Sequence, residues 1–344
     1  MTLHAMIPIP GDLHARYNRD SAGRDWLASL PGLISGALER WQLSVDLAPG
    51  AEPWNGHGAL VVPVLMEGMS AALKIAFPHD EAVVERHALA LWEGRGAVRL
   101  LASDAGSCSM VLERLDASRW LQDAPMHRAI ETWGGIVREL SIQPGEGHEC
   151  RVFDHIAATA ERWSDELPAE WERLDRPFPR WLLEAALEVC QTRGAVGRRS
   201  SKDVLVHTDL HFMNILATRE DQQGRGSYLA IDPQPQIGEA EFAVAPILWN
   251  RLGDLSRTDP EAALRERCVD FSLAAGLDPG IAQQWSIARE VENALWYAAK
   301  PGHAGDLARS LWVASTMAGR TLENLPRAHE LPDPGAVISW GREP

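Results

Sequence analysis

The spacing of apolar residues changes along the chain, from a helical pattern near the N-terminus to a strand pattern in the following segment. Residues 12–46 carry an apolar stripe at helical spacing, formed by Trp26, Leu27, Leu30, Leu33, Ile34, Leu38 and Trp41. This stripe predicts one or two helices interrupted at Pro31, because proline removes a helical hydrogen bond. From residue 59 two short apolar runs flank Glu67 and Gly68, which predicts a β-hairpin.

The next segment mixes both patterns. Residues 80–92 return to helical spacing, whereas residues 97–103 and 109–115 form short apolar runs typical of strands. Together with the hairpin, these elements predict a small, mostly antiparallel sheet with one helix over about residues 50–115.

Beyond Asp116 the pattern is mainly helical. Amphipathic stretches cover residues 127–141, 152–166, 178–192, 261–275 and 280–315. Two short strands, residues 203–207 and 227–231, interrupt them and are separated by a polar, glycine-containing turn. We predict an α+β fold of two lobes, with residues 1–115, including the N-terminal helical extension, in one lobe and residues 116–344 in the other.

Composition narrows the class of protein. The 344 residues suffice for about two domains, and 33 basic against 48 acidic residues give a net charge of −15, which argues against nucleic acid as a partner. The longest apolar run, residues 59–66, is far shorter than the roughly 20 residues that cross a bilayer, and the N-terminus has no signal-peptide pattern. Four cysteines without a CxxC pair favour reduced thiols. We expect a cytoplasmic protein without a membrane partner, and the acidic balance suits either solubility or a cationic substrate.

The stretch from Val204 to Asp232 holds the strongest candidate chemistry. A predicted strand runs into HTDLHFMN, in which Asn214 follows Asp209 by five residues, and Asp232 ends the second strand. Phosphoryl transfer needs one carboxylate to accept the proton of the attacking hydroxyl, and amide and carboxylate oxygens to hold Mg²⁺. The pattern therefore indicates a kinase-type site.

Two alternatives compete with this interpretation. Asp209 and Asn214 are also common turn residues between a strand and a helix. His207, Asp209 and His211 alternate and would suit zinc, although Asn214 and Asp232 would then have no role. Phosphoryl transfer is favoured because the upstream lobe supplies the remaining parts.

Those parts are a lysine and a glutamate. Lys74 lies inside the apolar run AALKIAF, where a buried charge is costly unless it is paired. Glu81 and Glu85 lie four residues apart in the following predicted helix and thus share a face. A strand lysine paired to a helix glutamate is the kinase arrangement for holding ATP phosphates, whereas a lysine on the solvent face of an edge strand is the simpler alternative.

In this order, the strand lysine, the helix glutamate, HTDLHxxN and IDP resemble the aminoglycoside phosphotransferase family, kinase-like enzymes whose catalytic loop reads HxDxxxxN. The segments LWEGRGAVRLL (91–101) and IDPQPQIG (231–238) are similar to the aminoglycoside/hydroxyurea resistance kinases, the group that includes streptomycin 6-kinases. The resemblance implies a protein-kinase-like fold with a small N-terminal nucleotide-binding lobe and a larger helical lobe. It also implies ATP and Mg²⁺ as cofactors.

Carried over by position, the resemblance implies that Asp209 is the catalytic base and that Asn214 and Asp232 are magnesium ligands. Lys74 would hold the ATP phosphates, and Glu85 would orient Lys74.

The remaining nucleotide contacts follow in the same way. A hinge that meets adenine is expected at Glu113, Arg114 and Leu115. A turn that covers the nucleotide is expected to contain Gly56 and Gly58, because glycine permits close backbone approach to phosphate.

The chain also departs from the family pattern. Ala243 stands where the family commonly has an aspartate that supports the catalytic loop, so we expect a repacked loop with activity retained. Thr208 and Phe212 replace small or rigid residues beside the catalytic aspartate, and we expect them to change the mouth of the acceptor site.

The acceptor is expected to be a small molecule with a hydroxyl group. Candidate acceptor residues are His211, Trp249, Glu290, Asn293 and Trp296, each of which also suits a purely structural role. The favoured function is an antibiotic-resistance kinase acting on an aminoglycoside or hydroxyurea. A metabolic kinase for a sugar or amino sugar and a noncatalytic nucleotide-binding module stay open, as does the choice between monomer and dimer.

Overall fold

The computed structural model describes residues 7–78, 80–145, 148–194, 200, 202–220 and 226–331. The chain divides into two compact units. One unit comprises Met1–Ser118 and Leu216–Ile231, and the other comprises Arg119–Ile215 and Asp232–Pro344. The division after Ser118 lies three residues beyond the expected lobe boundary, and the segment 216–231 joins the first unit.

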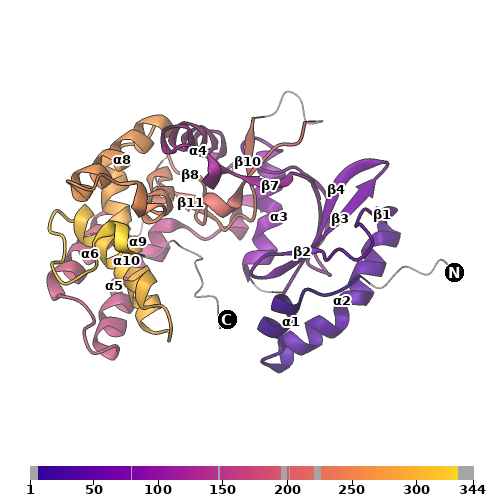
Figure 1. Cartoon of the computed structure of the whole chain (residues 1–344), viewed down its shortest axis with the longest axis horizontal. Helices are drawn as coiled ribbons and strands as arrows, with labels where there is room; N and C mark the ends of the chain where they lie inside the picture. Colours follow the sequence, from indigo (N-terminus) through magenta and orange to yellow (C-terminus); the bar gives the residue numbers. More distant parts are fainter. Residues whose placement is uncertain are drawn as a thin grey trace. The chain divides into compact units, whose positions relative to one another are not determined.

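The first unit is built on an antiparallel sheet (Figure 1). Its elements are α1 (Gly11–Tyr17), α2 (Ser21–Arg40), β1 (Leu43–Val45), β2 (Trp54–Asn55), β3 (Ala59–Met66), β4 (Met69–Ala76), α3 (Asp80–Trp92), β5 (Leu100–Asp104), β6 (Ser109–Glu113) and β10 (Tyr228–Ala230). The sheet has the order β1-β3-β4-β6-β5, and β2 pairs with the start of β3 on the edge that β1 occupies further along the strand. The predicted small sheet with one helix is confirmed.

The hairpin predicted around Glu67 and Gly68 is formed by β3 and β4. Met66 pairs with Met69, so the loop has two residues, and both adopt positive φ, 52° and 81°. Positive φ at both central positions is the conformation that matches the twist of a tight hairpin, and glycine reaches it without strain.

The expected interruption at Pro31 is wrong. Helix α2 runs unbroken from Ser21 to Arg40 with Pro31 inside it, and the break lies earlier, between α1 and Asp20. The Asp20 side chain caps α2 by accepting a hydrogen bond from the Gly23 N–H at 2.8 Å. The helix continues past the proline because its apolar stripe is buried against the sheet, and this packing outweighs the roughly 3 kcal/mol that an internal proline costs.

The side chains of β4 point to two different environments. Leu73 and Ile75 point into the core shared with α2, whereas Lys74, between them, points to the opposite face. Figure 1 shows α3 on that opposite side of the sheet and α1 and α2 on the first side. Both faces of β4 are covered, so Lys74 is only 7% exposed.

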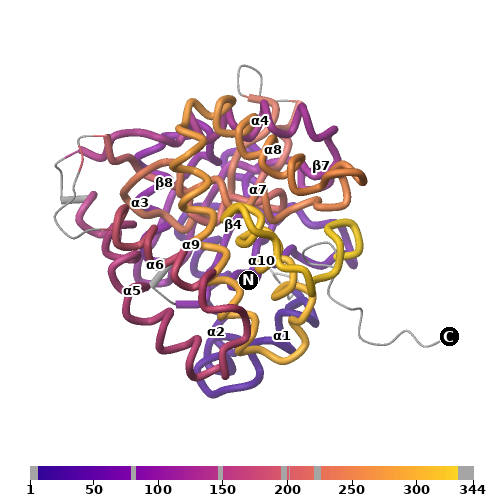
Figure 2. The backbone as a smooth tube through the Cα atoms, turned by 90° about the vertical axis from the view of Figure 1, so that its left-hand side faces the viewer, coloured from indigo at the N-terminus to yellow at the C-terminus, as the bar shows by residue number. Residues whose placement is uncertain are grey.

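The second unit is mainly helical, as predicted. Its principal elements are α4 (Met126–Leu140), α5 (Ile156–Arg173), α6 (Arg180–Arg193), β8 (Val204–His207), β11 (Pro235–Gly238), the 3₁₀ turn η4 (Ala240–Ala243), α7 (Ala245–Trp249), α8 (Pro260–Ala275), α9 (Pro279–Ala298) and α10 (Ala304–Met317). The predicted stretch 280–315 is two helices, because Gly302 with φ 85° lies in the turn between α9 and α10. These two helices pack along each other (Figure 2).

The two short strands predicted in this part of the chain are present, but they do not pair with each other. Residues 203–207 and 227–231 do not form one hairpin: β8 pairs with β11, and β10 pairs with the three-residue strand β9 (Ile215–Ala217). In turn, β9 pairs with β7 (Asp116–Trp120). Three apolar residues directly after Asn214 were too short a pattern to predict β9. Within the described ranges, no helix is both long and apolar enough to cross a membrane.

Two glycine substitutions test the hairpin against a matched helical site. Gly68→Ala should destabilise the protein by about 1 kcal/mol or more, because alanine is strained at φ 81°. Gly36→Ala in α2 should stabilise it by up to about 1 kcal/mol, because an added Cβ there meets nothing within 4 Å. Urea unfolding of both variants measures the difference, and equal signs for the two changes would contradict the assignment of the turn.

Candidate active site

The sheet and α3 bring the predicted lysine and glutamate together. Lys74 Nζ lies 2.7 Å from each carboxylate oxygen of Glu85, and the two residues are 7% and 3% exposed. A buried charge without a partner would be strongly destabilising, so each group accounts for the burial of the other. The solvent-facing alternative for Lys74 is therefore wrong. The side chain of Glu81 is outside the part of the chain that the structure describes.

The turn proposed to cover the nucleotide is fixed from α1. Arg16 donates hydrogen bonds to the carbonyl oxygens of Gly56 (2.9 Å) and His57 (2.6 Å). Phe77 closes the turn from β4 by donating its N–H to the Gly58 oxygen at 2.8 Å. A Cβ on Gly56 would meet nothing within 4 Å, so the fold alone does not require glycine at that position.

The expected adenine hinge lies at the end of β6. Glu113 exchanges two hydrogen bonds with the Arg99 backbone: its N–H donates to the Arg99 oxygen (3.0 Å), and its carboxylate accepts from the Arg99 N–H (2.7 Å). Arg114 donates to Asp46 at 2.6 Å, and Leu115 is 6% exposed. These contacts hold the segment rigidly, and its contact with adenine stays a prediction.

The catalytic loop follows β8, whose four residues are all buried. Thr208 is tied to the residue before β11, because both its N–H (3.0 Å) and its hydroxyl (2.7 Å) donate to the Gln234 oxygen. Asn214 closes the loop by donating its side-chain amide to the Asp209 backbone oxygen at 2.9 Å. The loop thus brings Asp209 and Asn214 together, as the motif predicts.

The Asp209 carboxylate is open enough for a substrate to reach. Its side chain is 39% exposed, and His211 Nε2 lies 3.7 Å from one of its oxygens. Partial burial raises the pKa of Asp209 above its ordinary value, and the charge of Asp232 adds to this. His211, Arg289 and the Asn214 amide act in the opposite direction. This is an environment in which a carboxylate can accept a proton.

Asn214 and Asp232 offer oxygen donors of the kind that Mg²⁺ prefers. The Asn214 nitrogen is used by Asp209, which leaves its amide oxygen as the group for a cation. Asp232 is exposed and adopts a positive φ of 54°, a conformation that aspartate tolerates better than most residues. The donor set fits magnesium, and magnesium binding by these two residues stays a prediction.

The geometry gives the zinc alternative no support. His207 is 2% exposed inside β8, and within the described ranges no three His, Cys, Asp or Glu side chains are grouped as a metal site. The expected effect of Phe212 on the acceptor mouth stays a prediction. Phe212 is fully buried, and its ring lies 5.0 Å from that of Trp133, because the loop turns it into the core beneath α4.

Four of the five candidate acceptor residues lie on α9 or stack against it. Glu290 is buried at 1% exposure, and Asn293 donates to it at 3.4 Å. Trp249 stacks on Tyr297, with ring centres 6.0 Å apart and 5° between the planes, and Trp296 is 47% exposed. His211 lies apart from these four, beside Asp209. Contact of any of them with an acceptor stays a prediction.

Sequence reasoning missed two residues of this site, Tyr297 and Arg289. Arg289 of α9 donates to the backbone oxygens of Thr208 (2.7 Å) and Phe242 (2.8 Å), and its guanidinium lies 4.6 Å from the Phe242 ring centre. The sequence signal for Arg289 was a charged residue close to the apolar positions of a predicted helix. Ala243, beside Phe242, is 3% exposed, and no polar side chain stands at that position.

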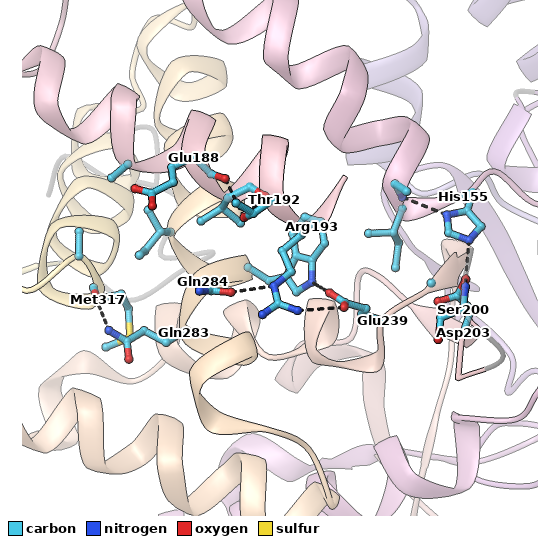
Figure 3. Close-up of a pocket in the computed structure, with 18 of the residues that line it drawn as sticks. His155, Glu188, Thr192, Arg193, Ser200, Asp203, Glu239, Gln283, Gln284 and Met317 are labelled. Atoms are coloured by element: carbon cyan, nitrogen blue, oxygen red, sulfur yellow. Dashed lines mark hydrogen bonds and ion pairs between the residues drawn. The ribbon is translucent and has the colours of Figure 1, made fainter. Parts of the chain in front are cut away.

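A cavity of about 770 Å³ lies within the second unit, between α5, α6, α9 and the end of β11 (Figure 3). Figure 3 shows Arg193 in its centre, where it bonds to Gln284 (2.7 Å) and Glu239 (3.2 Å), while His155 pairs with Asp203 at 3.0 Å. Asp203 precedes β8 and Asp209 follows it, so the cavity lies at the opposite end of this strand from the catalytic loop.

Comparison with known proteins gives a consistent result. Residues 40–301 match the family described as aminoglycoside/hydroxyurea antibiotic resistance kinase. The chain is 34% identical to a streptomycin 6-kinase from Streptomyces glaucescens over 86% of this chain and 92% of that protein. It is 33% identical to a hydroxyurea phosphotransferase from Kitasatospora aureofaciens over 92% of this chain and 87% of that protein.

The fold is also found among solved structures. A ternary complex of an aminoglycoside phosphotransferase, APH(4)-Ia, with AMP-PNP and hygromycin B superimposes with a TM-score of 0.53 at 13% identity, covering 83% of this chain and 96% of that one. The predicted protein-kinase-like α+β fold is confirmed.

The buried Glu290 gives a pH-dependent prediction. Burial raises its pKa to about 7, against hydrogen bonds from Ser310 and Asn293 and the charge of Arg289, which lower it. Folding raises the pKa of Glu290, so the folded state is favoured while this carboxyl is protonated. The stabilisation is complete below the unfolded pKa and is lost as the pH rises towards about 7, where the buried group ionises. Glu290→Gln should therefore raise the stability at pH 8 by up to about 3 kcal/mol and change it little at pH 4.5.

Thermal unfolding at both pH values measures this effect. Glu266→Gln on the exposed face of α8 is the matched control and should show no pH-dependent difference from the wild type. A Glu290→Gln variant that is equally affected at pH 4.5 and pH 8 would contradict the prediction.

Proposed function

Because the chain belongs to the aminoglycoside/hydroxyurea antibiotic resistance kinase family, and is therefore a phosphotransferase acting on a hydroxyl group, we propose that it phosphorylates a cationic, streptomycin-like aminoglycoside with ATP. The observation that carries the proposal is the loop in which Asn214 fixes the half-exposed Asp209. A dead kinase would not need to keep this carboxylate both positioned and accessible.

The residues divide the reaction between them. Asp209 orients the acceptor hydroxyl and takes its proton while the acceptor oxygen forms a bond to the γ-phosphorus. The bond from that phosphorus to the β–γ bridging oxygen breaks, and ADP leaves. Lys74, held by Glu85, binds the ATP phosphates. Magnesium, held by Asn214 and Asp232, would neutralise phosphate charge when bound.

The negative charges around Tyr297 of α9 favour a cationic acceptor. Burial raises the pKa of Tyr297, and the negative charges of Asp306, Glu290 and Asp209 raise it further. The same negative potential attracts an ammonium or guanidinium group. Trp249 and the exposed Trp296 offer faces on which a sugar ring or a cation would stack.

ATP is the proposed phosphoryl donor, with adenine at Glu113, Arg114 and Leu115 and the phosphates beneath the turn that contains Gly56 and Gly58. We place the reaction in the cytoplasm and expect no nucleic-acid or membrane partner, given the net charge of −15. A metabolic kinase for amino sugars would use the same residues, so the acceptor panel below decides between these functions.

The first experiment measures ADP release with Mg-ATP across streptomycin, other aminoglycosides, hydroxyurea, amino sugars and sugars, with product mass checked for one phosphoryl group. Asp209→Asn should lower turnover by about 100- to 10,000-fold, because the base is lost, and leave ATP binding intact. Asp203→Asn, at the other end of β8, is the matched control and should keep turnover within a few-fold.

Each outcome of this experiment is informative. Full turnover in Asp209→Asn would contradict the mechanism. Turnover with sugars alone would favour the metabolic kinase, and nucleotide binding without any turnover would favour the noncatalytic module.

A second prediction concerns the turn held by Arg16. Arg16→Ala removes both hydrogen bonds to the carbonyls of Gly56 and His57, each contributing about 1 kcal/mol. It should raise the KM for ATP by about three- to tenfold, with kcat little changed. Arg24→Ala, an exposed change on α2, is the control. An unchanged KM for ATP in Arg16→Ala would show that this turn does not contribute to nucleotide binding.

A further inference from the structure

One half-buried arginine reaches the catalytic loop from a helix far along the chain. Arg289 lies in the middle of α9, and its two terminal nitrogens donate separately, one to the Thr208 oxygen at 2.7 Å and the other to the Phe242 oxygen at 2.8 Å. Its guanidinium also lies over the Phe242 ring. A planar guanidinium can satisfy two carbonyls at a fixed angle, which the single ammonium of lysine cannot do.

The Thr208 carbonyl is the last group before Asp209. On its other side, the Thr208 N–H and hydroxyl are bonded to the Gln234 oxygen. Thr208, the residue before Asp209, is therefore held on two sides: its N–H and hydroxyl bond to Gln234, directly before β11, and its carbonyl bonds to Arg289 of α9. With both directions fixed, the orientation of the Asp209 backbone is set before its side chain makes any contact.

The other end of this arrangement is equally fixed. Phe242 packs against Trp285 of α9, with ring centres 5.2 Å apart, and Trp285 donates to Glu239 at 2.7 Å. Glu239 is in turn bonded to Arg193 of α6. The segment from Glu239 to Phe242 is thus a rigid support, and Arg289 connects that support to the catalytic loop.

A backbone carbonyl accepts hydrogen bonds, and Arg289 supplies the donor for the Thr208 carbonyl from α9. An unsatisfied buried carbonyl would cost about 1–3 kcal/mol and would leave the peptide free to rotate.

We propose that Arg289 is a positioning residue for phosphoryl transfer, which holds the Thr208–Asp209 peptide so that the Asp209 carboxylate meets the acceptor hydroxyl. The inference rests on the proposed function and adds a residue to its machinery. Arg289 acts through Thr208 and contacts no substrate, so its loss affects the chemical step and leaves nucleotide affinity unchanged.

Kinetics of three variants test this role. Arg289→Gln should lower kcat by about 100-fold with the KM for ATP within about threefold, because a shift of about 1 Å in a reacting group has an effect of this size. Arg289→Lys keeps the charge but loses the fork and should recover only part of the activity. Arg267→Gln is the matched control: Arg267 is 5% exposed and also bonds two carbonyls, those of Asn250 (2.8 Å) and Arg251 (3.1 Å), away from Thr208.

Hydrogen exchange of the catalytic loop provides a readout that does not depend on the acceptor. Residues 208–216 should exchange faster in Arg289→Gln than in the wild type and at the wild-type rate in Arg267→Gln. All variants are compared at a temperature at which circular dichroism shows them folded, so that general unfolding does not enter the comparison.

The outcomes are distinct. A kcat for Arg289→Gln within threefold of the wild type, or an equal loss in Arg267→Gln, overturns the positioning role. If the wild type itself phosphorylates nothing in the panel, the proposed function fails, and the exchange experiment alone decides this inference: equal protection of residues 208–216 in wild type and Arg289→Gln overturns it.

Discussion

In the proposed reaction the Asp209 carboxylate must be open to the acceptor and yet held still, and the arrangement of the residues around its loop depends on this constraint. Asp209 is too exposed for tight packing to fix its side chain, so the order must come from its backbone. Asn214, Gln234 and Arg289 supply that order from three directions. The helices around the loop then serve mainly to bury these supports and keep them dry.

The first unit meets a related constraint by a different route. In the proposed reaction Lys74 binds phosphate through its charge, but it lies in a strand that is covered on both faces. Glu85 neutralises that charge at short range and fixes the direction of the ammonium group. Lys74 is thus held in place by charge pairing, and Asp209 is held in place by hydrogen bonds to its backbone. Both residues are therefore positioned before any ligand binds.

The sequence predicted those features whose cause is local. The hairpin at Glu67 follows from turn chemistry, and the pairing of Lys74 follows from a charge in an apolar run. Pro31 was misjudged because helix continuity there depends on packing against the sheet, which a local rule does not include. Arg289 was missed for a related reason: its partners are backbone carbonyls, which every residue has, so no complementary side chain marks them in the sequence.

The segment 216–231 has a consequence for how the protein is made. It belongs to the first unit, where the Ala230 N–H donates to the Gly96 oxygen and the Val98 N–H donates to the Ala230 oxygen. A nascent chain that has emerged only as far as Ser118 therefore lacks part of this unit. The first unit reaches its full set of contacts only after the ribosome has translated the catalytic loop and passed Ile231, so this unit cannot complete its folding until the Arg119–Ile215 part of the second unit has also been synthesised.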